Sequence, residues 1–423
     1  GLFVPRELPR LPWPPPVVDA DAAGPLDPED AAGPRDREDA DWRPVARWAA
    51  EEFFPSVDPA ALHPISDSAL DFPVPLVEVE PNLWVLELFH GPTHAFKDVG
   101  ARFMAGLMAS LEAPAKGGVR TVLVATSGDT GGAVASAFHG LVGYRVVALF
   151  PQGGISERQR RQMTTLGGNV RAVAVDGSFD DCQRLVKEAF RDQDLSREQG
   201  LTSANSINVG RLLPQAFYYV HAAARLDSPH FFVPAGNLGN LCAGLLAWKA
   251  GMPAAGFTAA VNENRGFVDY LEGADFKARP SVPTTSSAMD VGDPSNLERI
   301  RWLFGGEDQA VRRHVSGVSV SQEEVARCIG DLYRRTGYVA DPHTAVAYEA
   351  ASRRGDNGGR PRVVLATAHP AKFPDTVEQA IGREVELPPG LSKIQDRNEE
   401  MIGITAELTA LATVLRERGA RHD

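Results

Sequence analysis

His90-Gly-Pro-Thr-His-Ala-Phe-Lys-Asp98 separates an apolar, strand-like run at residues 83–89 from a helical pattern that begins at Val99. Gly91 and Pro92 predict a tight turn, because glycine tolerates unusual backbone angles and proline fixes φ. Lys97 is therefore expected where a loop enters a helix, and the positive end of the helix dipole favours its neutral amine. A neutral amine can attack a carbonyl carbon and form a Schiff base. The alternative is an ordinary solvated lysine in a first helical turn.

Two glycine-rich stretches each lie between a predicted strand and a predicted helix: Thr126-Ser-Gly-Asp-Thr-Gly-Gly132 and Pro234-Ala-Gly-Asn-Leu-Gly-Asn240. The backbone N–H groups of such a loop point at a helix N-terminus and suit an anion. The second loop has neither the Lys-Ser/Thr of a P-loop nor the dinucleotide spacing, so its anion is not expected to belong to a nucleotide. The alternatives are an ordinary strand-to-helix turn for the second loop and N-capping by Asp129 and Thr130 for the first.

Two further stretches place polar side chains where a site is expected. Thr367-Ala-His-Pro-Ala-Lys-Phe373 follows a predicted strand, so Thr367 lies at the carboxyl edge where α/β sheets bind ligands. Asn205-Ser-Ile-Asn208 and Arg211 combine amide, hydroxyl and guanidinium groups, and arginine is a preferred partner of phosphate. A strand-end cap at Thr367, and caps with a salt bridge around Arg211, are the alternatives.

In their order and approximate spacing, these stretches closely resemble the threonine synthase family, which consists of fold-type-II enzymes dependent on pyridoxal phosphate. The resemblance is to the longer bacterial and fungal branch and spans about residues 86–378. It implies pyridoxal 5'-phosphate as cofactor, with cofactor-binding roles for Phe96, Lys97, Asp129, Gly236, Asn237, Leu238, Gly239, Asn240 and Thr367. It implies substrate-binding roles for Thr126, Ser127, Gly128, Asp129, Thr130, Asn205, Ser206 and Arg211, with Asn208 a weaker candidate, and no metal site.

The resemblance also implies what each part does. Residues 236–240 hold the cofactor phosphate, residues 126–131 hold the substrate α-carboxylate, and Thr367 faces the pyridine nitrogen. Lys97 is the catalytic residue that carries the cofactor as a Schiff base and then removes the α-proton of O-phospho-L-homoserine. Phosphate leaves from the γ-carbon, water adds at the β-carbon, and L-threonine is released. Residues 286–291, residues 341–345, His369 and Lys372 have no role that the sequence assigns.

Three alternatives remain open on the same residues. A phospholyase acting on O-phosphohomoserine or O-phosphothreonine would share the cofactor and phosphate sites and release a 2-oxo acid. A serine/threonine dehydratase is less favoured, because it has no need for a phosphate-binding Arg211. A non-catalytic, truncated homologue that acts only as a binding protein is the alternative of another class.

Composition limits the partners and the compartment. The 423-residue chain has a formal net charge of −12, which argues against nucleic acid or an anionic membrane as partner. Its three cysteines have no CxxC spacing, which favours a reducing, cytoplasmic location without disulfides or a zinc site. No apolar run reaches bilayer length. A monomer or homodimer that binds a small phosphorylated amino acid is expected.

The fold class predicted is α/β, with two lobes of mostly parallel sheet flanked by helices, similar to the β-subunit of tryptophan synthase. Near-continuous apolar strands at residues 121–125, 145–150 and 170–175 alternate with helices, and a second series follows at 230–233, 256–261 and 362–367. The predicted parts are an N-terminal segment at 1–78, the lysine-bearing lobe at 79–226 and a second lobe at 227–423. Within the first part, residues 20–41 read as acidic and flexible and 42–54 as a short helix, and a leading segment of the family is expected to be absent.

Overall fold

The computed structural model describes residues 7–16, 35–36, 41–111, 118–205, 208–355 and 358–417. The chain forms two compact units, and each combines segments that are far apart in sequence. Unit 1 comprises Gly1–Gly91 and Leu212–Glu386, and unit 2 comprises Pro92–Arg211 and Leu387–Asp423. The predicted parts at 1–78, 79–226 and 227–423 are contiguous, so their boundaries differ from this division.

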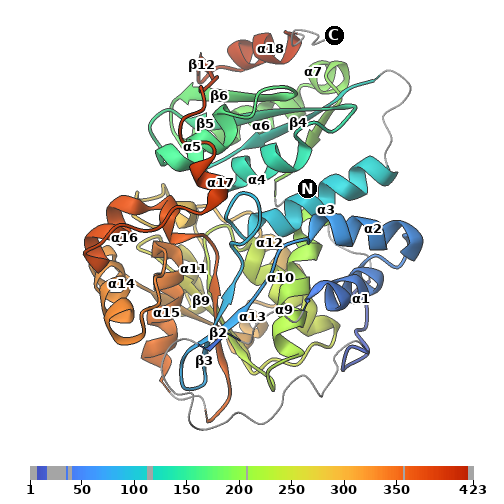
Figure 1. The fold of residues 1–423 in the computed structure, drawn as a ribbon. Coiled ribbons are helices and arrows are strands. Elements are labelled where there is room, and N and C mark those ends of the chain that lie inside the picture. Colours follow the sequence, from blue (N-terminus) through green and yellow to red (C-terminus); the bar gives the residue numbers. More distant parts are fainter. Residues whose placement is uncertain are drawn as a thin grey trace. The chain divides into compact units, whose positions relative to one another are not determined.

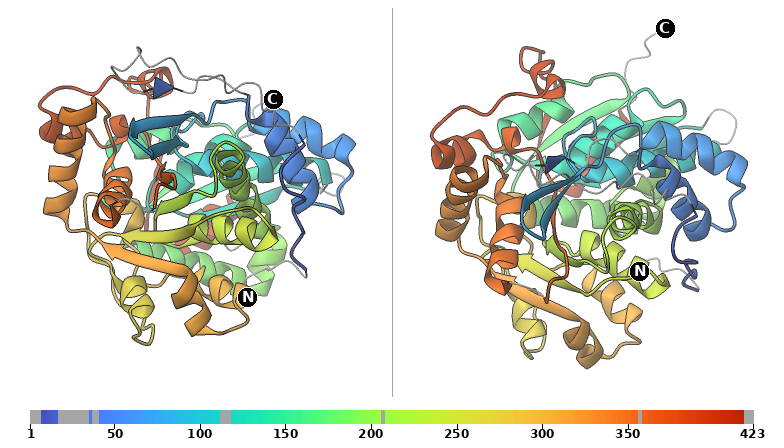
Figure 2. Two further views of the ribbon diagram at one scale, coloured as in Figure 1. Left: turned by 90° about the horizontal axis from the view of Figure 1, so that it is seen from below. Right: turned by 60° about the horizontal axis from the view of Figure 1, so that its bottom comes forward.

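Within the described residues, unit 1 contains a seven-stranded sheet with the order β1-β2-β3-β11-β8-β9-β10. The five neighbouring strands β3, β11, β8, β9 and β10 are parallel. At one edge of the sheet, β2 pairs antiparallel with β3, and β1 pairs antiparallel with β2. Figure 2 shows β10 at the other edge of this sheet, in orange. The strands are β1 (Arg35–Asp36), β2 (Leu76–Glu80), β3 (Leu83–Glu87), β8 (His230–Pro234), β9 (Gly256–Val261), β10 (Val315–Ser319) and β11 (Arg362–Ala366). The helices are α1 (Arg43–Phe53), α2 (Pro59–Ala69), η2 (Leu213–Gln215), α9 (Ala216–Ala223), α10 (Gly239–Ala250), α11 (Gly266–Leu271), η3 (Ser287–Met289), α12 (Leu297–Leu303), α13 (Asp308–His314), α14 (Gln322–Thr336), α15 (Pro342–Arg354), η4 (Pro370–Lys372) and α16 (Pro374–Ile381).

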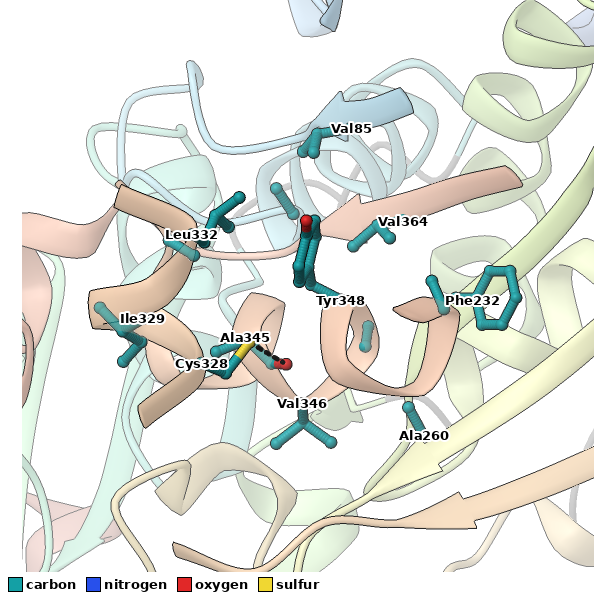
Figure 3. Close-up of a cluster of buried hydrophobic side chains, with 14 of the residues drawn as sticks. Val85, Phe232, Ala260, Cys328, Ile329, Leu332, Ala345, Val346, Tyr348 and Val364 are labelled. Atoms are coloured by element: carbon teal, nitrogen blue, oxygen red, sulfur yellow. Dashed lines mark hydrogen bonds between the residues drawn. The ribbon is translucent and has the colours of Figure 1, made fainter. Parts of the chain in front are cut away.

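Helices cover both faces of the unit 1 sheet, and neighbouring residues of β8 show this directly. The Phe231 ring packs on Tyr219 of α9 with centroids 4.9 Å apart. Phe232 points to the opposite face, because side chains alternate along a strand, and it joins the core beneath α14 and α15. Figure 3 shows this core, whose labelled members are Val85, Phe232, Ala260, Cys328, Ile329, Leu332, Ala345, Val346, Tyr348 and Val364.

Within the described residues, unit 2 contains a five-stranded sheet with the order β12-β6-β5-β4-β7, in which every pair is parallel. The strands are β4 (Arg120–Ala125), β5 (Tyr144–Pro151), β6 (Val170–Asp176), β7 (Leu201–Ser203) and β12 (Ile402–Thr405). The helices are α3 (Lys97–Leu111), α4 (Asp129–Phe138), α5 (Glu157–Thr164), α6 (Phe179–Arg191), α7 (Gln193–Glu198), α17 (Pro389–Ser392) and α18 (Leu408–Arg416), with α8 (Val209–Leu212) at its boundary. Along β4, Val122 and Val124 join one buried cluster while Leu123 and Ala125 join another, so both faces are covered.

The C-terminal segment belongs to unit 2, which the sequence did not reveal. Strand β12 extends the sheet beside β6, and α18 packs against α6 (Figure 1). Leu411, Val414 and Leu415 supply the buried face of α18. This docking separates residues 387–423 from the lobe predicted at 227–423.

The predicted α/β class with two mostly parallel sheets is confirmed. The helix predicted at residues 42–54 is confirmed as α1, and its Val45, Trp48, Ala49 and Phe53 are buried as the spacing predicts. Most of the predicted acidic segment lies outside the described residues, although Arg35–Asp36 forms the edge strand β1. No helix in the described part of the chain is long and apolar enough to cross a membrane.

Candidate active site

Lys97 is the first residue of α3, as the sequence predicts. The turn before it is closed by Asp98, which is fully buried and accepts hydrogen bonds from the Thr93 backbone N–H (2.8 Å) and the Thr93 hydroxyl (2.6 Å). His94 adopts a positive φ of 55° in this turn. The buried carboxylate thus fixes the loop from which Lys97 emerges.

The amine of Lys97 lies beside a carboxylate. Its Nζ is 3.5 Å from Asp129 Oδ2 and 4.7 Å from the centroid of the Phe96 ring, and its side chain is 15% exposed. A carboxylate at this distance attracts the charged ammonium. The neutral amine expected from the helix N-terminus stays a prediction, because the carboxylate of Asp129 favours the opposite, charged form.

The loop at residues 126–130 is organised by Thr126. Its buried hydroxyl accepts hydrogen bonds from the backbone N–H of Gly128 (2.9 Å) and Gly131 (2.7 Å) and donates to the Gly128 carbonyl (3.0 Å). Helix α4 begins at Asp129 with Gly128 as the N-cap, so the alternative that Asp129 or Thr130 caps this helix is wrong. Ser127 and Thr130 are only half-buried.

Two glutamines of α5 each contact one of the two unit 2 segments that carry predicted site residues, the 126–130 loop and the turn before Lys97. Neither glutamine was predicted as a site residue. Gln159 Nε2 donates to Asp129 Oδ1 (2.9 Å), and Gln162 Nε2 donates to the Thr93 carbonyl (2.8 Å). A Cβ on Gly128 would lie 2.5 Å from the Gln159 side chain, so the loop and α5 are in close contact. The Ser156–Gln159 capping box was visible in the sequence as a helix start, but it carried no sign of this second contact.

The predicted substrate-phosphate residues are only partly described. Ser206 lies outside the described residues. Arg211 is 3% exposed, donates from Nη1 to the Ala204 carbonyl (2.7 Å), and burial lowers its pKa to about 10 against the attraction of Asp98. Asn205 Oδ1 is buried and has no hydrogen-bond partner in the part of the chain that the structure describes.

In unit 1, the loop at residues 236–240 connects β8 to α10, which begins at Gly239. Leu238 takes a left-handed conformation with φ 60°. Asn237 Oδ1 accepts from the Ser295 backbone N–H (2.7 Å) and hydroxyl (2.9 Å), and its carbonyl accepts from Asn296 Nδ2 (2.9 Å). Ser295 and Asn296 therefore hold the loop, and no sequence pattern had singled them out.

Thr367 directly follows β11, at the carboxyl end that it shares with the parallel strand β8. It is 4% exposed. His369 accepts a hydrogen bond from Ala371 N–H (3.1 Å) and packs edge-on against Phe89, while Lys372 is fully buried. The 236–240 loop and Thr367 thus share one edge of the unit 1 sheet, and Thr367 lies at the carboxyl end of its strand as predicted.

Comparisons with known proteins agree with this set of residues. The family described as "Pyridoxal-phosphate dependent enzyme" matches residues 70–368, and the one described as "Threonine synthase, C-terminal" matches residues 344–415. The chain is 43% identical to threonine synthase of Haemophilus influenzae, over 79% of this chain and 78% of that protein. The chain belongs to the threonine synthase family.

Solved structures of the family lead to the same assignment. The crystal structure of threonine synthase from Escherichia coli has a TM-score of 0.86 and 37% identity, covering 98% of this chain and 93% of its own. The pyridoxal-phosphate-bound threonine synthase from Brucella melitensis has a TM-score of 0.85 and 34% identity with the same coverages. The protein thus has threonine synthase activity, as a carbon–oxygen lyase with pyridoxal phosphate as its cofactor.

The residues of the 236–240 loop fit the phosphate of this cofactor. Asn240 Oδ1 accepts hydrogen bonds from the hydroxyls of Tyr218 (2.7 Å) and Tyr219 (2.8 Å), and burial raises the pKa of both tyrosines, so they remain protonated donors. These bonds orient the amide, whose Nδ2 is buried without a partner among the described residues. A donor left free at the first turn of α10 suits a phosphate oxygen.

Glu399, in the C-terminal segment, holds α5 in unit 2. It accepts from Arg160 Nε (2.8 Å), Arg161 Nη1 (2.9 Å) and the Thr164 hydroxyl (2.7 Å). The Arg160 hydrogen bond is the largest cause that lowers the pKa of Glu399 to about 2. Because α5 carries Gln159 and Gln162, this carboxylate supports both loops of unit 2.

Glu399→Gln is expected to lower the free energy of unfolding by about 2 kcal/mol at pH 7, because charge-assisted bonds to a part-buried carboxylate are lost. A carboxyl whose pKa is depressed by folding stabilises the fold above its unfolded pKa of about 4.3 and loses this effect as the pH falls towards 2. Urea unfolding at pH 7 and pH 3 measures the difference, which should shrink at pH 3. Glu157→Gln is the matched control, since Glu157 is 69% exposed and 3.7 Å from the same Arg161. A difference that is equal at both pH values contradicts the prediction.

Proposed function

We propose that the substrate is O-phospho-L-homoserine, which the enzyme converts with water to L-threonine and phosphate. The observation that carries this proposal is the buried Arg211 in a chain that belongs to the threonine synthase family and pairs Lys97 with Asp129. A buried guanidinium suits a dianionic phosphate, because a charged donor is worth more away from water.

Cofactor-binding roles are proposed in each unit. In unit 2 they belong to Phe96, Lys97 and Asp129. In unit 1 they belong to residues 236–240 and Thr367. Bound pyridoxal phosphate supplies an electron sink that stabilises negative charge on the substrate α-carbon. Lys97 Nζ binds the cofactor covalently and, when free, takes up the α-proton, while Asp129 at 3.5 Å orients the amine. The half-buried Ser127 and Thr130 are proposed to bind the substrate α-carboxylate with the backbone N–H groups of their loop.

Arg211→Lys is expected to raise the KM for O-phospho-L-homoserine by about 10-fold to 100-fold, because lysine cannot donate two parallel hydrogen bonds to a phosphate. The affinity for pyridoxal phosphate should stay unchanged, since Arg211 is assigned to the substrate. Initial rates and an absorbance titration with cofactor separate the two effects. Arg197→Lys is the control, because its side chain is 76% exposed. Weaker cofactor binding with an unchanged KM contradicts the assignment.

The proposal is tested by quantifying L-threonine, inorganic phosphate and 2-oxobutanoate during turnover of O-phospho-L-homoserine. Equal amounts of threonine and phosphate support it. Phosphate matched by 2-oxobutanoate identifies a phospholyase instead, and no product with an intact cofactor absorbance identifies a non-catalytic homologue.

Three expectations stay predictions from the sequence: a monomer or homodimer, a cytoplasmic location, and no nucleic-acid or membrane partner. Sedimentation equilibrium of the purified enzyme tests the first of them.

A further inference from the structure

Two segments that the sequence left without a role contact each other in unit 1. Residues 286–291 include the short helix η3, and residues 341–345 include the start of α15. The backbone N–H of Ala288 donates a hydrogen bond to Nε2 of His343 at 3.2 Å. His343 is 2% exposed, so water does not compete for this contact.

This contact sets the protonation pattern of the His343 ring. Because Nε2 accepts a hydrogen bond, it carries no proton, and in the neutral ring the proton is on Nδ1. Nδ1 lies 2.7 Å from Oδ1 of Asp341, which is fully buried and accepts a hydrogen bond from the Nδ1–H. The Phe373 ring packs edge-on against the imidazole with centroids 4.9 Å apart.

Asp341 is itself held in one orientation. As the N-cap of α15 it accepts from the backbone N–H groups of His343 (2.9 Å) and Thr344 (3.3 Å), and also from the Thr344 hydroxyl. Both carboxylate oxygens are thus occupied, so the carboxylate directs the His343 tautomer as a carboxylate does for many ligating histidines.

The backbone that His343 holds lies against the 236–240 loop. A Cβ on Gly236 would lie 2.7 Å from Met289 Cα and 3.0 Å from the Ala288 carbonyl oxygen. The same segment is fixed on its other side by Asn262, whose Nδ2 donates to the Ser286 hydroxyl (3.0 Å) and to Asp290 Oδ1 (2.8 Å). Its position therefore limits where Gly236 can lie.

We propose that Asp341 and His343 are positioning residues for the cofactor phosphate. Asp341 keeps the proton on Nδ1, His343 Nε2 then holds the Ala288 N–H, and the 288–289 backbone supports Gly236 at the start of the phosphate-binding loop. This inference rests on the proposed role of residues 236–240. Neither residue touches the cofactor, and both act through the loop.

The test compares the binding of pyridoxal 5'-phosphate with that of pyridoxal, which lacks the phosphate. Asp341→Asn preserves the size of the side chain and its capping ability. Its single, uncharged amide oxygen can accept from His343 Nδ1 only while the NH₂ faces the Thr344 backbone N–H, so the substitution weakens the hold on the Nδ1 proton. The dissociation constant of pyridoxal phosphate, measured by absorbance titration, is expected to rise about 10-fold to 100-fold, and that of pyridoxal to stay unchanged.

Asp58→Asn is the matched control. Asp58 also precedes a proline and caps a helix, accepting from Ala60 N–H at 2.9 Å. It should change neither dissociation constant. His343→Phe, which keeps a ring and removes the acceptor, should reproduce the phosphate-specific loss of Asp341→Asn.

An equal loss of affinity for both ligands, or no loss for either, overturns the proposal. If both variants fail to fold, ¹⁵N chemical shifts of labelled histidine in the wild-type holoenzyme decide it, because a protonated Nε2 on His343 is incompatible with the mechanism. Gly236→Ala distinguishes an error in the loop assignment from an error in the positioning role. If Gly236→Ala leaves the affinity for pyridoxal phosphate unchanged, the phosphate loop itself is wrongly assigned. If Gly236→Ala loses affinity and Asp341→Asn does not, only the positioning role is wrong.

Discussion

Lys97→Ala is expected to reduce threonine formation by about 10⁴-fold, because both the covalent attachment of the cofactor and the base that takes the α-proton are lost. The amine is the group 3.5 Å from Asp129 at the start of α3, where Asp98 and Thr93 fix the preceding turn. Turnover assays measure the loss. Borohydride reduction followed by peptide mapping should label Lys97 in the wild-type enzyme.

Two variants control for indirect effects of this change. Lys97→Arg keeps a positive charge beside the buried Asp129, so it should fold as the wild type does and still lose activity. Lys187→Ala removes an exposed lysine of α6 and should leave activity unchanged. A label on another lysine, or activity in Lys97→Arg within 10-fold of wild type, contradicts the assignment.

Gly236→Ala is expected to weaken the binding of pyridoxal phosphate by about 10-fold to 100-fold. The added Cβ would meet the Met289 Cα at 2.7 Å, and a backbone atom cannot move aside as a flexible side chain can. Overpacking of this kind costs about 1–3 kcal/mol, and here the cost falls on the loop assigned to the phosphate. Absorbance titration of the cofactor-free enzyme measures the dissociation constant.

Gly403→Ala is the control for the glycine substitution, because a Cβ there meets nothing within 4 Å. Thermal unfolding of both variants without cofactor distinguishes a local change from a general loss of stability. If Gly236→Ala binds the cofactor as the wild type does, the loop tolerates displacement and its proposed contact with the phosphate is contradicted.

The local elements were largely predictable because their signals are short-range. The turn before Lys97 follows from Gly91 and Pro92, and the parallel strands follow from apolar runs such as residues 121–125 and 145–150. The 126–130 and 236–240 loops were found as strand-to-helix connections, although α4 and α10 begin within them, at Asp129 and Gly239. The family, the cofactor and the activity followed from the order of these motifs.

The contacts that hold the motifs could not be predicted, because they join residues far apart in sequence. Glu399 binds α5 across more than 230 residues, and Ser295 binds Asn237 across 58. N-capping of α4 by Asp129 and Thr130 was the alternative reading, whereas the Thr126 hydroxyl accepts from the Gly131 N–H of the first turn. The neutral Lys97 was inferred from a helix dipole alone, and its contact with Asp129 at 3.5 Å could not be foreseen.

By itself, the sequence determined the kind of chemistry: a lysine at a helix start, two anion-binding loops and the order that marks a pyridoxal-phosphate enzyme. Only the tertiary structure decided the composition of the two units, the docking of residues 387–423 on β6, and the Asp341–His343–Ala288 contacts. The reason is physical. Backbone propensity and loop chemistry act over a few neighbouring residues, whereas burial and hydrogen-bond pairing between distant segments exist only once the chain has folded.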